Sequence, residues 1–451
     1  MSPAGTIFAL STGVGRAGVA VVRLSGPASD AALRCLMTGI GNALAENPSD
    51  TAAELPAPRV LRRAMLHDAD GAILDDAMVV RFVAPHSFTG EAVVELHVHG
   101  SPAVIRAVLN TLSTLPQLRP AEPGEFTQRA FLNGKMDLAA VEGLGDLIDA
   151  QTEAQRRLSL RQLGGALSEK VQAWRDAIIM LRAETEAWID FPDEDLPADF
   201  FPTVRTRAAA LAREMENATA QSHRLAAHVR DGFTVALVGL PNVGKSSLLN
   251  ALAARDVAIV TDIAGTTRDA LSVPIELDGF LVNVVDTAGL RETADQIEAI
   301  GVDRALQAAQ SADLVLWLID ERGEDVDFGA RLGDAPVVKV ASKEDLWSGG
   351  DYTVGVSSVT GTGLDGILQT IQAALLGDDV SLEGVLPMGR QRHAHHVAEA
   401  VAALAISQDQ EELALLAECM RDASAALGRI TGAVDVEDVL DHIFSRFCIG
   451  K

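Results

Sequence analysis

The stretch Gly239–Ser247, with the sequence GLPNVGKSS, constrains the fold of this 451-residue chain more than any other. The apolar run TVALVG precedes it, and the helix-forming segment SLLNALA follows it. A glycine-rich turn between a strand and a helix lets backbone N–H groups surround a phosphate, where the helix N-terminus adds its positive dipole. The stretch therefore predicts a phosphate-binding loop in an α/β domain, and the alternative is a glycine-rich turn that matches by chance.

The pattern of apolar residues changes along the chain and predicts a multidomain protein. Residues 1–120 mix strand-like apolar runs with a helical segment, which indicates an α+β domain. Residues 231–377 alternate short apolar runs with helix-length segments, as βαβ units around a mostly parallel sheet do. Residues 121–230 and 378–451 have helical periodicity, so we expect one all-α domain into which the α/β domain is inserted.

The chain is strongly acidic and poor in cysteine. Asp and Glu number 63 against 37 Lys and Arg, which gives a net charge of −26. Such a surface repels phosphate backbones, so binding to nucleic acid over a wide area is not expected without a partner. Cys35, Cys419 and Cys448 have neither disulfide-framework nor metal-ligand spacing, which indicates a reducing compartment. Because we find no secretory leader and no apolar run of about 18 residues, we expect a cytoplasmic protein without a membrane span.

Side chains in and after the loop have the types that a Mg²⁺-bound nucleoside triphosphate requires. Lys245 would reach the β- and γ-phosphates as a point charge, and Ser246 would offer its hydroxyl to Mg²⁺. Thr266 and Thr267, in DIAGTTRD, stand where a first switch segment places a hydroxyl and an amide near Mg²⁺ and the γ-phosphate. Asp286–Gly289, DTAG, follows the apolar run LVNVVD, and its aspartate would hold Mg²⁺ through water. In this order the motifs indicate a P-loop NTPase of the GTPase type.

A fourth segment, VVKVASKEDL, stands where such proteins read the base. Ser342 replaces the expected asparagine, and Asp345 can accept hydrogen bonds from the N1–H and N2–H₂ edge of guanine. Adenine presents an acceptor there, so guanine specificity should survive, with about 1 kcal/mol of affinity lost for the missing amide contact. Ser357 and Ser358 match the last base-contacting loop. Leu290 follows DTAG where a Ras-type enzyme carries a water-orienting glutamine, so another group must position the water.

Seven segments together resemble the MnmE/TrmE family of tRNA-modification GTPases, and the similarity runs nearly end to end. They are PNVGKSSLLNAL, TDIAGTTRD, DTAGLRETADQIEAIG, AWIDFPDE, HSFTGEAVVELHVHG, RPAEPGEFTQRAFLNGKMDL and the terminal FCIGK. The resemblance implies an N-terminal tetrahydrofolate-binding domain that also dimerises, an all-α domain built from both flanks, and an inserted Ras-like α/β P-loop G domain.

The resemblance also assigns the nucleotide and its catalytic metal ions to particular residues. It implies a K⁺ ion that replaces an arginine finger, bound by Asn242, Thr261, Ile263 and Thr266, and a Mg²⁺ ion on Ser246 and Thr267. Glu298 would orient the hydrolytic water, and it joins Lys245 and Asn242 in the catalytic set; read from sequence alone, it is an ordinary solvated helix glutamate. The GTP contacts implied are Asn242, Val243, Gly244, Lys245, Ser246, Ser247, Thr261, Asp262, Ile263, Ala264, Gly265, Thr266, Thr267, Asp286, Thr287, Ala288, Gly289, Ser342, Lys343, Asp345, Ser357, Ser358 and Val359.

The same resemblance implies a site for 5-formyltetrahydrofolate or 5,10-methylenetetrahydrofolate. Its binding residues would be Arg23, Glu95, Lys135 and Lys451, and Cys448 is a candidate thiol whose chemical role stays open. The residues by themselves also allow structural roles, with Arg23 pairing strands and Glu95 as a satisfied sheet carboxylate. His97 and His99 depart from the glycine- or glutamine-containing versions common in the family, which puts the shape of the pocket wall in doubt.

The function implied is GTP hydrolysis, activated by K⁺-dependent dimerisation of G domains, coupled to tRNA modification. The product would be a carboxymethylaminomethyl-type group at C5 of the wobble uridine. The implied partners are a second copy of the chain, the flavoprotein MnmG (GidA) in a heterotetramer, and tRNA held mainly by MnmG. The alternative is an RNA- or ribosome-binding assembly GTPase, although such switches usually carry a basic RNA module and none is visible here.

Overall fold

The computed structural model describes residues 5–13, 15–39, 54–190, 197–255, 272–286, 307, 309–321, 336–347, 351–376, 384–434, 440, 443–445, 447 and 450. The chain divides into two compact units, Met1–Gly145 with Thr431–Lys451, and Asp146–Ile430. The boundaries of the three expected domains stay a prediction.

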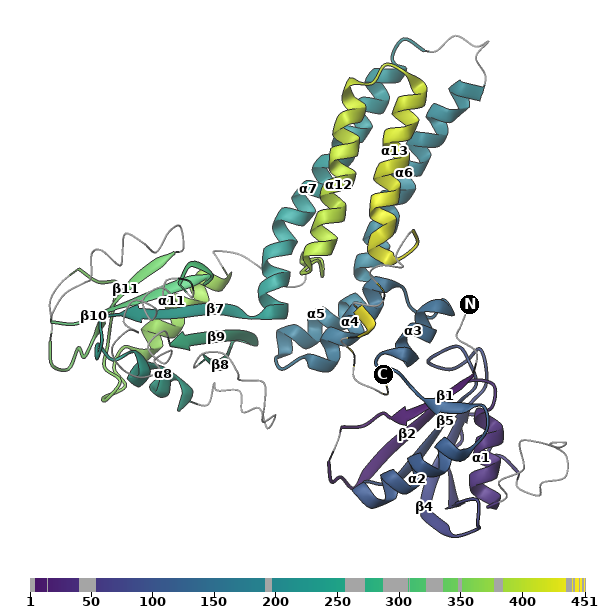
Figure 1. Ribbon diagram of the computed structural model, residues 1–451. Coiled ribbons are helices and arrows are strands. Elements are labelled where there is room, and N and C mark those ends of the chain that lie inside the picture. Colours follow the sequence, from purple (N-terminus) through teal and green to yellow (C-terminus); the bar gives the residue numbers. More distant parts are fainter. Residues whose placement is uncertain are drawn as a thin grey trace, which may run out of the picture. The chain divides into compact units, whose positions relative to one another are not determined.

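The first unit is built on a six-stranded sheet with the order β3-β4-β5-β2-β1-β6 (Figure 1). Neighbouring strands are antiparallel except β1 and β6, which are parallel. Its elements are β1 (Thr6–Leu10), β2 (Val19–Ser25), α1 (Ser29–Thr38), β3 (Arg62–His67), β4 (Ile73–Phe82), β5 (Val93–His99), α2 (Pro102–Thr114), β6 (Leu118–Pro120) and α3 (Glu125–Leu132), and α4 (Leu138–Asp149) begins in it.

Alternation along β2 gives this sheet two different faces. Val22 and Leu24 lie on the face that packs against α1 and α2, where Leu33 and Leu112 complete the buried cluster. Arg23 lies between them in sequence and therefore points to the opposite face, the one that carries a smaller apolar cluster around Ile7 and Phe126 from α3. The Arg23 side chain, which is expected to bind folate, thus lies on the face away from α1 and α2.

The second unit contains long helices contributed by both flanks of the α/β domain. They are α5 (Glu153–Leu163), α6 (Ala166–Asp190), α7 (Phe200–Asp231), α12 (Gln391–Ile406) and α13 (Leu413–Thr431). Helices α6, α7, α12 and α13 run side by side as a bundle (Figure 1), and Arg175 on α6 donates to the Ser424 carbonyl on α13 at 3.3 Å. Trp174 and Ile178 are buried on the inner face of α6, as the helical periodicity predicts.

A second six-stranded sheet, with the order β12-β11-β10-β7-β9-β8, forms the α/β domain. Its elements are β7 (Phe233–Gly239), α8 (Lys245–Ala253), β8 (Ser272–Leu277), β9 (Phe280–Asp286), β10 (Leu314–Ile319), β11 (Val337–Ser342), β12 (Val354–Val356) and α11 (Leu364–Leu376). All neighbours are parallel except β8 and β9. Every residue of β10 is buried, as expected of a central parallel strand covered on both faces.

The predicted fold class is confirmed: an N-terminal α+β domain, a helical domain, and an α/β P-loop domain inserted between its flanks. Among the helices that the structure describes, none is long and apolar enough to cross a membrane.

Candidate functional site

The candidate nucleotide site lies where the parallel strands of the α/β sheet end. Strand β7 pairs with β9 on one side and with β10, which comes later in the sequence, on the other side. The carboxyl ends of these strands, near Gly239, Asp286 and Ile319, therefore share one edge of the sheet. Ligands of open α/β sheets bind in the crevice at such a reversal of strand order.

The loop from Gly239 to Lys245 has the backbone of a phosphate-binding turn. Asn242 has a φ of 61° and Gly244, which caps α8, has a φ of 114°. The ammonium of Lys245 donates to the carbonyls of Gly239 at 2.8 Å and Leu240 at 3.0 Å, and the residue is only 6% exposed. The only positive charge of this loop is thus held inside it, next to the first turn of α8.

Ser246 and Asp286 come together although they are 40 residues apart in sequence. The Ser246 hydroxyl donates to Asp286 Oδ2 at 2.5 Å, and Asp286 is fully buried at the end of β9. A hydroxyl oxygen and a carboxylate are hard oxygen donors, the type that Mg²⁺ prefers. The pair fits the metal role expected of both residues.

The expected base-reading segment lies beside the phosphate loop. Lys343, with a φ of 59°, donates from Nζ to the Asn242 carbonyl at 2.9 Å and lies 3.4 Å from Asp320 Oδ2. Ser342 is buried, and its Oγ would lie 2.7 Å from a Cβ added to Gly244. Asp345 is exposed, which leaves its carboxylate accessible to a base.

The other described residues that are expected to contact GTP lie in and around these loops. Ser357 is buried, and its hydroxyl accepts from the Thr360 amide at 3.2 Å. Ser358 is half-buried and Val359 is exposed in the same turn. In the phosphate loop and the first turn of α8, Val243 is buried and Ser247 is exposed.

In the first unit, Arg23 and Glu95 face each other across β2 and β5. Arg23 Nε donates to Glu95 Oε1 at 2.9 Å, and the two side chains are 22% and 18% exposed. His97 Nε2 lies 3.5 Å from Glu95 Oε2 and, among the described residues, this buried atom has no hydrogen-bond partner. The Arg23 guanidinium also lies 5.5 Å from the centroid of the Phe88 ring and 5.9 Å from that of Phe126. This Arg–Glu–His cluster is partly accessible and flanked by aromatic rings.

Lys135 and His99 lie at other points of this unit. The Lys135 side chain lies beside Gly90, and within the described part of the chain it makes no hydrogen bond to Arg23 or Glu95. His99 pairs with Asp75 at 2.7 Å at the end of β5, and the hydrogen bond to that carboxylate raises the pKa of the imidazole. Of the two unusual histidines, only His97 therefore belongs to the Arg–Glu–His cluster.

Comparisons with known proteins cover nearly the whole chain. The sequence profile described as "MnmE helical domain" matches residues 138–448, and "GTP-binding protein TrmE N-terminus" matches residues 6–135. Two curated proteins named "tRNA modification GTPase MnmE" are similar over almost their full length: that of Bradyrhizobium sp. (strain ORS 278) is 47% identical over 99% of both chains, and that of Parvibaculum lavamentivorans is 46% identical over 99% of this chain and 100% of its own. The chain belongs to the MnmE family.

A solved structure is also similar to part of the chain. The G domain of FeoB from Methanococcus jannaschii is 26% identical, covers 32% of this chain and 97% of its own, and has a TM-score of 0.25. Membership of the MnmE family rests on the two sequence profiles and on the full-length relatives.

Several residues that were expected to take part in nucleotide, metal or folate binding, or in hydrolysis, lie outside the described residues. They are Thr261, Asp262, Ile263, Ala264, Gly265, Thr266, Thr267, Thr287, Ala288, Gly289, Glu298, Cys448 and Lys451, and the same holds for Leu290. The structure therefore brings together Lys245, Ser246 and Asp286 in the nucleotide site, and Arg23 with Glu95 in the first unit.

Asp320 lies beside the candidate nucleotide site and was not predicted from the sequence. It is 3% exposed at the end of β10, and its carboxylate lies 3.4 Å from Lys343 Nζ. A carboxylate that directly follows the apolar run LVLWLI was the available signal, since buried acids are retained mainly where a charge partner exists. Its position favours an orienting role toward Lys343.

Proposed function

We propose that this MnmE-family protein hydrolyses GTP and uses that hydrolysis in the modification of tRNA. The observation that carries the proposal is the convergence of Lys245, Ser246 and Asp286 at one edge of a parallel sheet, next to the loop that carries Asp345. Full-length relatives named tRNA modification GTPase support the same reading. We propose domain boundaries of 1–120, 231–377, and 121–230 with 378–451.

In this proposal the phosphate loop supplies backbone N–H donors and the Lys245 ammonium, which changes partners when the nucleotide binds. Lys245 exchanges its hydrogen bonds to two loop carbonyls for bonds to the β- and γ-phosphates. The new bonds are stronger, because the phosphate oxygens are charged acceptors and the carbonyl oxygens are neutral. Ser246 would hold Mg²⁺ directly with Thr267, and Asp286 would hold it through water. When bound, Mg²⁺ would neutralise charge on the phosphates.

Guanine is selected by the segment after β11. The exposed Asp345 carboxylate accepts from the guanine N1–H and N2–H₂ groups, whereas adenine offers an acceptor at the same edge. Lys343 holds this segment against the phosphate loop through the Asn242 carbonyl. We therefore propose that Ser342 weakens guanine binding only modestly, because Lys343 still braces the segment.

Water activation needs a group other than glutamine, since Leu290 occupies that position. We propose that Asn242, with Thr261, Ile263 and Thr266, binds K⁺ when two G domains pair, and that Glu298 holds the hydrolytic water. Asn242 fits this role because it is exposed on the phosphate loop. When bound, K⁺ would offset negative charge that develops between the β- and γ-phosphates.

GTPase rates in K⁺ and in Na⁺ test this part of the proposal. The wild type should turn over faster in K⁺, and Asn242→Ala should remove that difference while GDP affinity is retained. Glu298→Ala should bind nucleotide and lose turnover. Equal wild-type rates in the two salts would refute the K⁺ mechanism and leave GTP binding intact.

We propose that the first unit holds a reduced folate on the Arg–Glu–His cluster. Arg23 can bind a carboxylate or carbonyl oxygen, and Glu95 can accept from pterin N–H groups, so the pair matches both kinds of polar group on the ligand. Phe88 and Phe126 offer apolar surface beside them. Lys135, Lys451 and Cys448 would complete the site, and the bound folate would supply the one-carbon unit.

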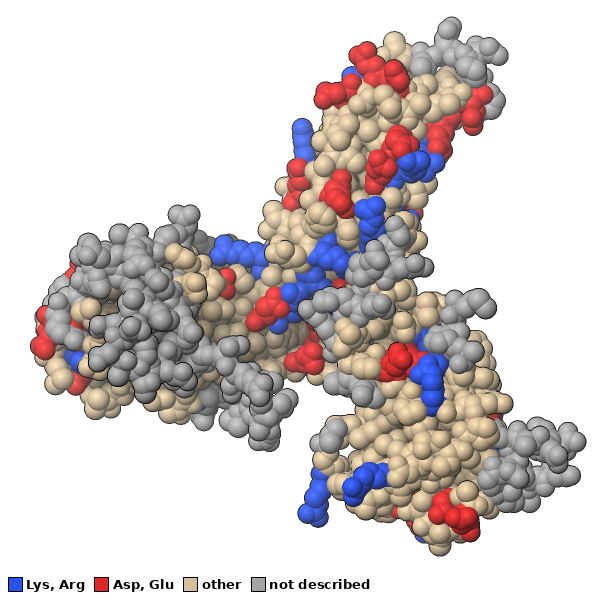
Figure 2. All heavy atoms as spheres, viewed as in Figure 1, with Lys and Arg blue, Asp and Glu red and all other residues tan. Residues whose placement is uncertain are grey.

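The partners proposed are a second copy of the chain, MnmG and tRNA, in the cytoplasm. On the face drawn in Figure 2, basic side chains gather over α5 and the C-terminal end of α7, while acidic side chains are spread along the helical bundle. On α5, Arg156 and Arg157 share the carboxylate of Glu153, which leaves limited positive charge for a phosphate backbone. We therefore propose that MnmG holds most of the tRNA.

Calorimetric titration with 5-formyltetrahydrofolate separates this function from an assembly GTPase that binds RNA or ribosomes. The tRNA-modifying enzyme should bind the folate, and Arg23→Met or Glu95→Gln should weaken that binding. Arg63→Met, on a more exposed ion pair in the same unit, is the matched control. Absence of folate binding by the wild type would favour the assembly GTPase.

A further inference from the structure

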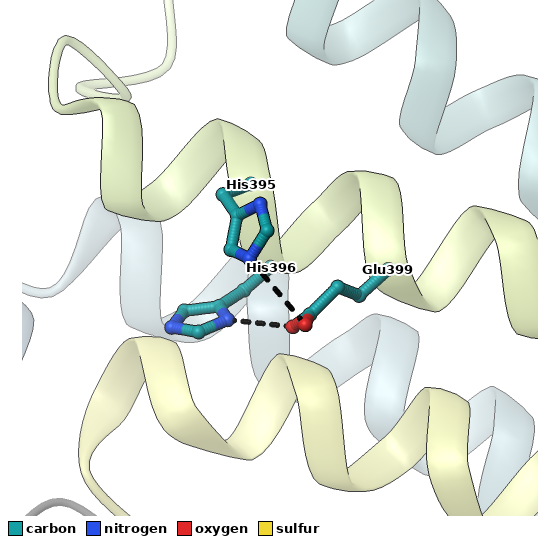
Figure 3. A group of neighbouring side chains, drawn as sticks. All are labelled: His395, His396 and Glu399. Atoms are coloured by element: carbon teal, nitrogen blue, oxygen red, sulfur yellow. Dashed lines mark hydrogen bonds and ion pairs between the residues drawn. The ribbon is translucent and has the colours of Figure 1, made fainter.

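A group of side chains of the types that bind metal ions lies on α12, outside both candidate sites. His395 and His396 both contact Glu399, from four and three residues before it, as Figure 3 shows. His396 Nδ1 lies 2.8 Å from Glu399 Oε2, and His395 Nε2 lies 3.4 Å from Glu399 Oε1. The ligand atoms of the three side chains all lie within 4.8 Å of one another.

These distances come close to those of a coordinated metal ion. Nitrogen and oxygen ligands about 2.1 Å from a tetrahedral ion lie about 3.4 Å from one another. The His395 contact to Glu399, at 3.4 Å, matches that separation, and the His396 contact, at 2.8 Å, is shorter. His395 is 68% exposed, so few neighbours restrict its ring. His396 is 14% exposed, which gives the site one ligand whose position is fixed by packing.

The donor set selects the class of ion. Two imidazoles and one carboxylate suit a first-row transition ion such as Zn²⁺, whereas Mg²⁺ and Ca²⁺ prefer oxygen donors. With three protein ligands, a fourth position stays open to water or to another molecule. The site is therefore chemically distinct from the oxygen-donor pair Ser246 and Asp286.

One neighbouring charge opposes a cation at this position. Arg429, on α13, lies with Nη1 3.3 Å from Glu399 Oε2. A metal ion that takes Oε2 competes with this guanidinium for the same oxygen, so metal binding weakens the Arg429–Glu399 ion pair. Affinity should therefore rise when the guanidinium is removed.

We propose that His395, His396 and Glu399 form a binding site for one divalent transition-metal ion, with Zn²⁺ as the ion of best-matched chemistry. Binding weakens the Arg429–Glu399 ion pair and thereby changes one contact between two helices of the bundle. The proposal is independent of GTP hydrolysis and of folate, because it uses none of their residues.

Zn²⁺ titration of the nucleotide-free full-length chain, in excess Mg²⁺ and against a chromophoric chelator, tests the proposal. His395→Ala and Glu399→Gln should each weaken binding of one Zn²⁺ by about tenfold or more, because even outer-shell changes at metal sites cost 10–100-fold. His86→Ala, an exposed histidine of the first unit, should change nothing. Arg429→Gln should tighten binding.

A second measurement guards against misfolded variants. The Co²⁺-loaded wild type should show visible d–d absorption that His396→Ala alters while far-UV circular dichroism is unchanged. Identical Zn²⁺ stoichiometry and affinity in the wild type and in the His395→Ala variant would overturn the proposal, as would an equal loss in His86→Ala.

Discussion

The contact between the phosphate loop and the base-reading segment leads to a quantitative prediction for Gly244→Ala. Gly244 has a φ of +114°, a region that L side chains rarely adopt, and the new methyl group would lie 2.7 Å from Ser342 Oγ. The backbone strain costs about 1–3 kcal/mol. The buried Ser342 hydroxyl must also leave its rotamer, which adds about 0.5–1.5 kcal/mol. We therefore expect a loss of about 1.5–4.5 kcal/mol in the free energy of unfolding of the G domain.

Adding Ser342→Ala separates the two costs. Without Oγ, the next atom of residue 342 is its Cβ at 4.0 Å, an ordinary contact, so only the backbone strain remains. The double variant should recover about 0.5–1.5 kcal/mol relative to the sum of the single variants. Gly361→Ala is the matched control, because it has a φ of +79° and no atom within 4 Å of the new methyl group.

Urea unfolding followed by tryptophan fluorescence measures these free energies, and titration with labelled GDP reports whether the loop still binds phosphate. Gly361→Ala should be additive with Ser342→Ala. If Gly244→Ala were equally additive, to within about 0.3–0.5 kcal/mol, the close approach of Ser342 to the phosphate loop would be refuted.

Three further predictions concern charged groups. Asp345→Asn removes a charge-assisted hydrogen bond and should weaken GDP binding by about 1.5–3 kcal/mol, measured by fluorescence titration; a xanthine nucleotide should lose less, because its C2 carbonyl accepts from the new amide. Arg129→Met should lower the free energy of unfolding by about 3–5 kcal/mol in urea, because it leaves the buried carboxylate of Glu125 without this partner. Burial alone would raise the pKa of Asp313, but hydrogen bonds from His228 and the Thr234 amide hold that pKa below its ordinary value. The ionised Asp313 carboxylate therefore stabilises the fold above about pH 4, and this contribution is lost as the pH falls through its lower folded-state pKa. In Asp313→Asn, the free energy of unfolding measured in urea should fall less steeply between neutral and acidic pH than in the wild type.

The nucleotide site was largely predictable from sequence because its determinants are local. The strand, the glycines, Lys245 and α8 follow one another within a few residues, and a central parallel strand such as β10 reads as one apolar run. The order of the motifs then places their side chains at the same edge of the sheet. Among the described residues, the carboxylate of Asp320 was not predicted, because a single acid after an apolar run does not reveal which cation it will contact.

The first unit was harder to predict, since its determinants are non-local. Strand β3 carries arginines at residues 62 and 63 and alternates exposed and buried positions at the edge of the sheet, so it lacks the apolar signal of a central strand. Arg23 and Glu95 meet only because β2 and β5 pair in one register. A shift of that register by one residue would point the two side chains to opposite faces, and no local pattern fixes it.

Gly450 shows how such non-local packing could serve the proposed folate site. Ser11 donates its hydroxyl to the Gly450 carbonyl at 3.0 Å, and a Cβ on Gly450 would lie 2.1 Å from the Leu10 carbonyl, so only glycine allows this approach. Leu10 pairs with Val22, the residue next to Arg23. Gly450 is therefore anchored on the strand pair that also carries Arg23, although most of the sequence separates them. The folate-binding role proposed for Cys448 and Lys451, which neighbour Gly450 in sequence, would therefore start from a contact made within the first unit.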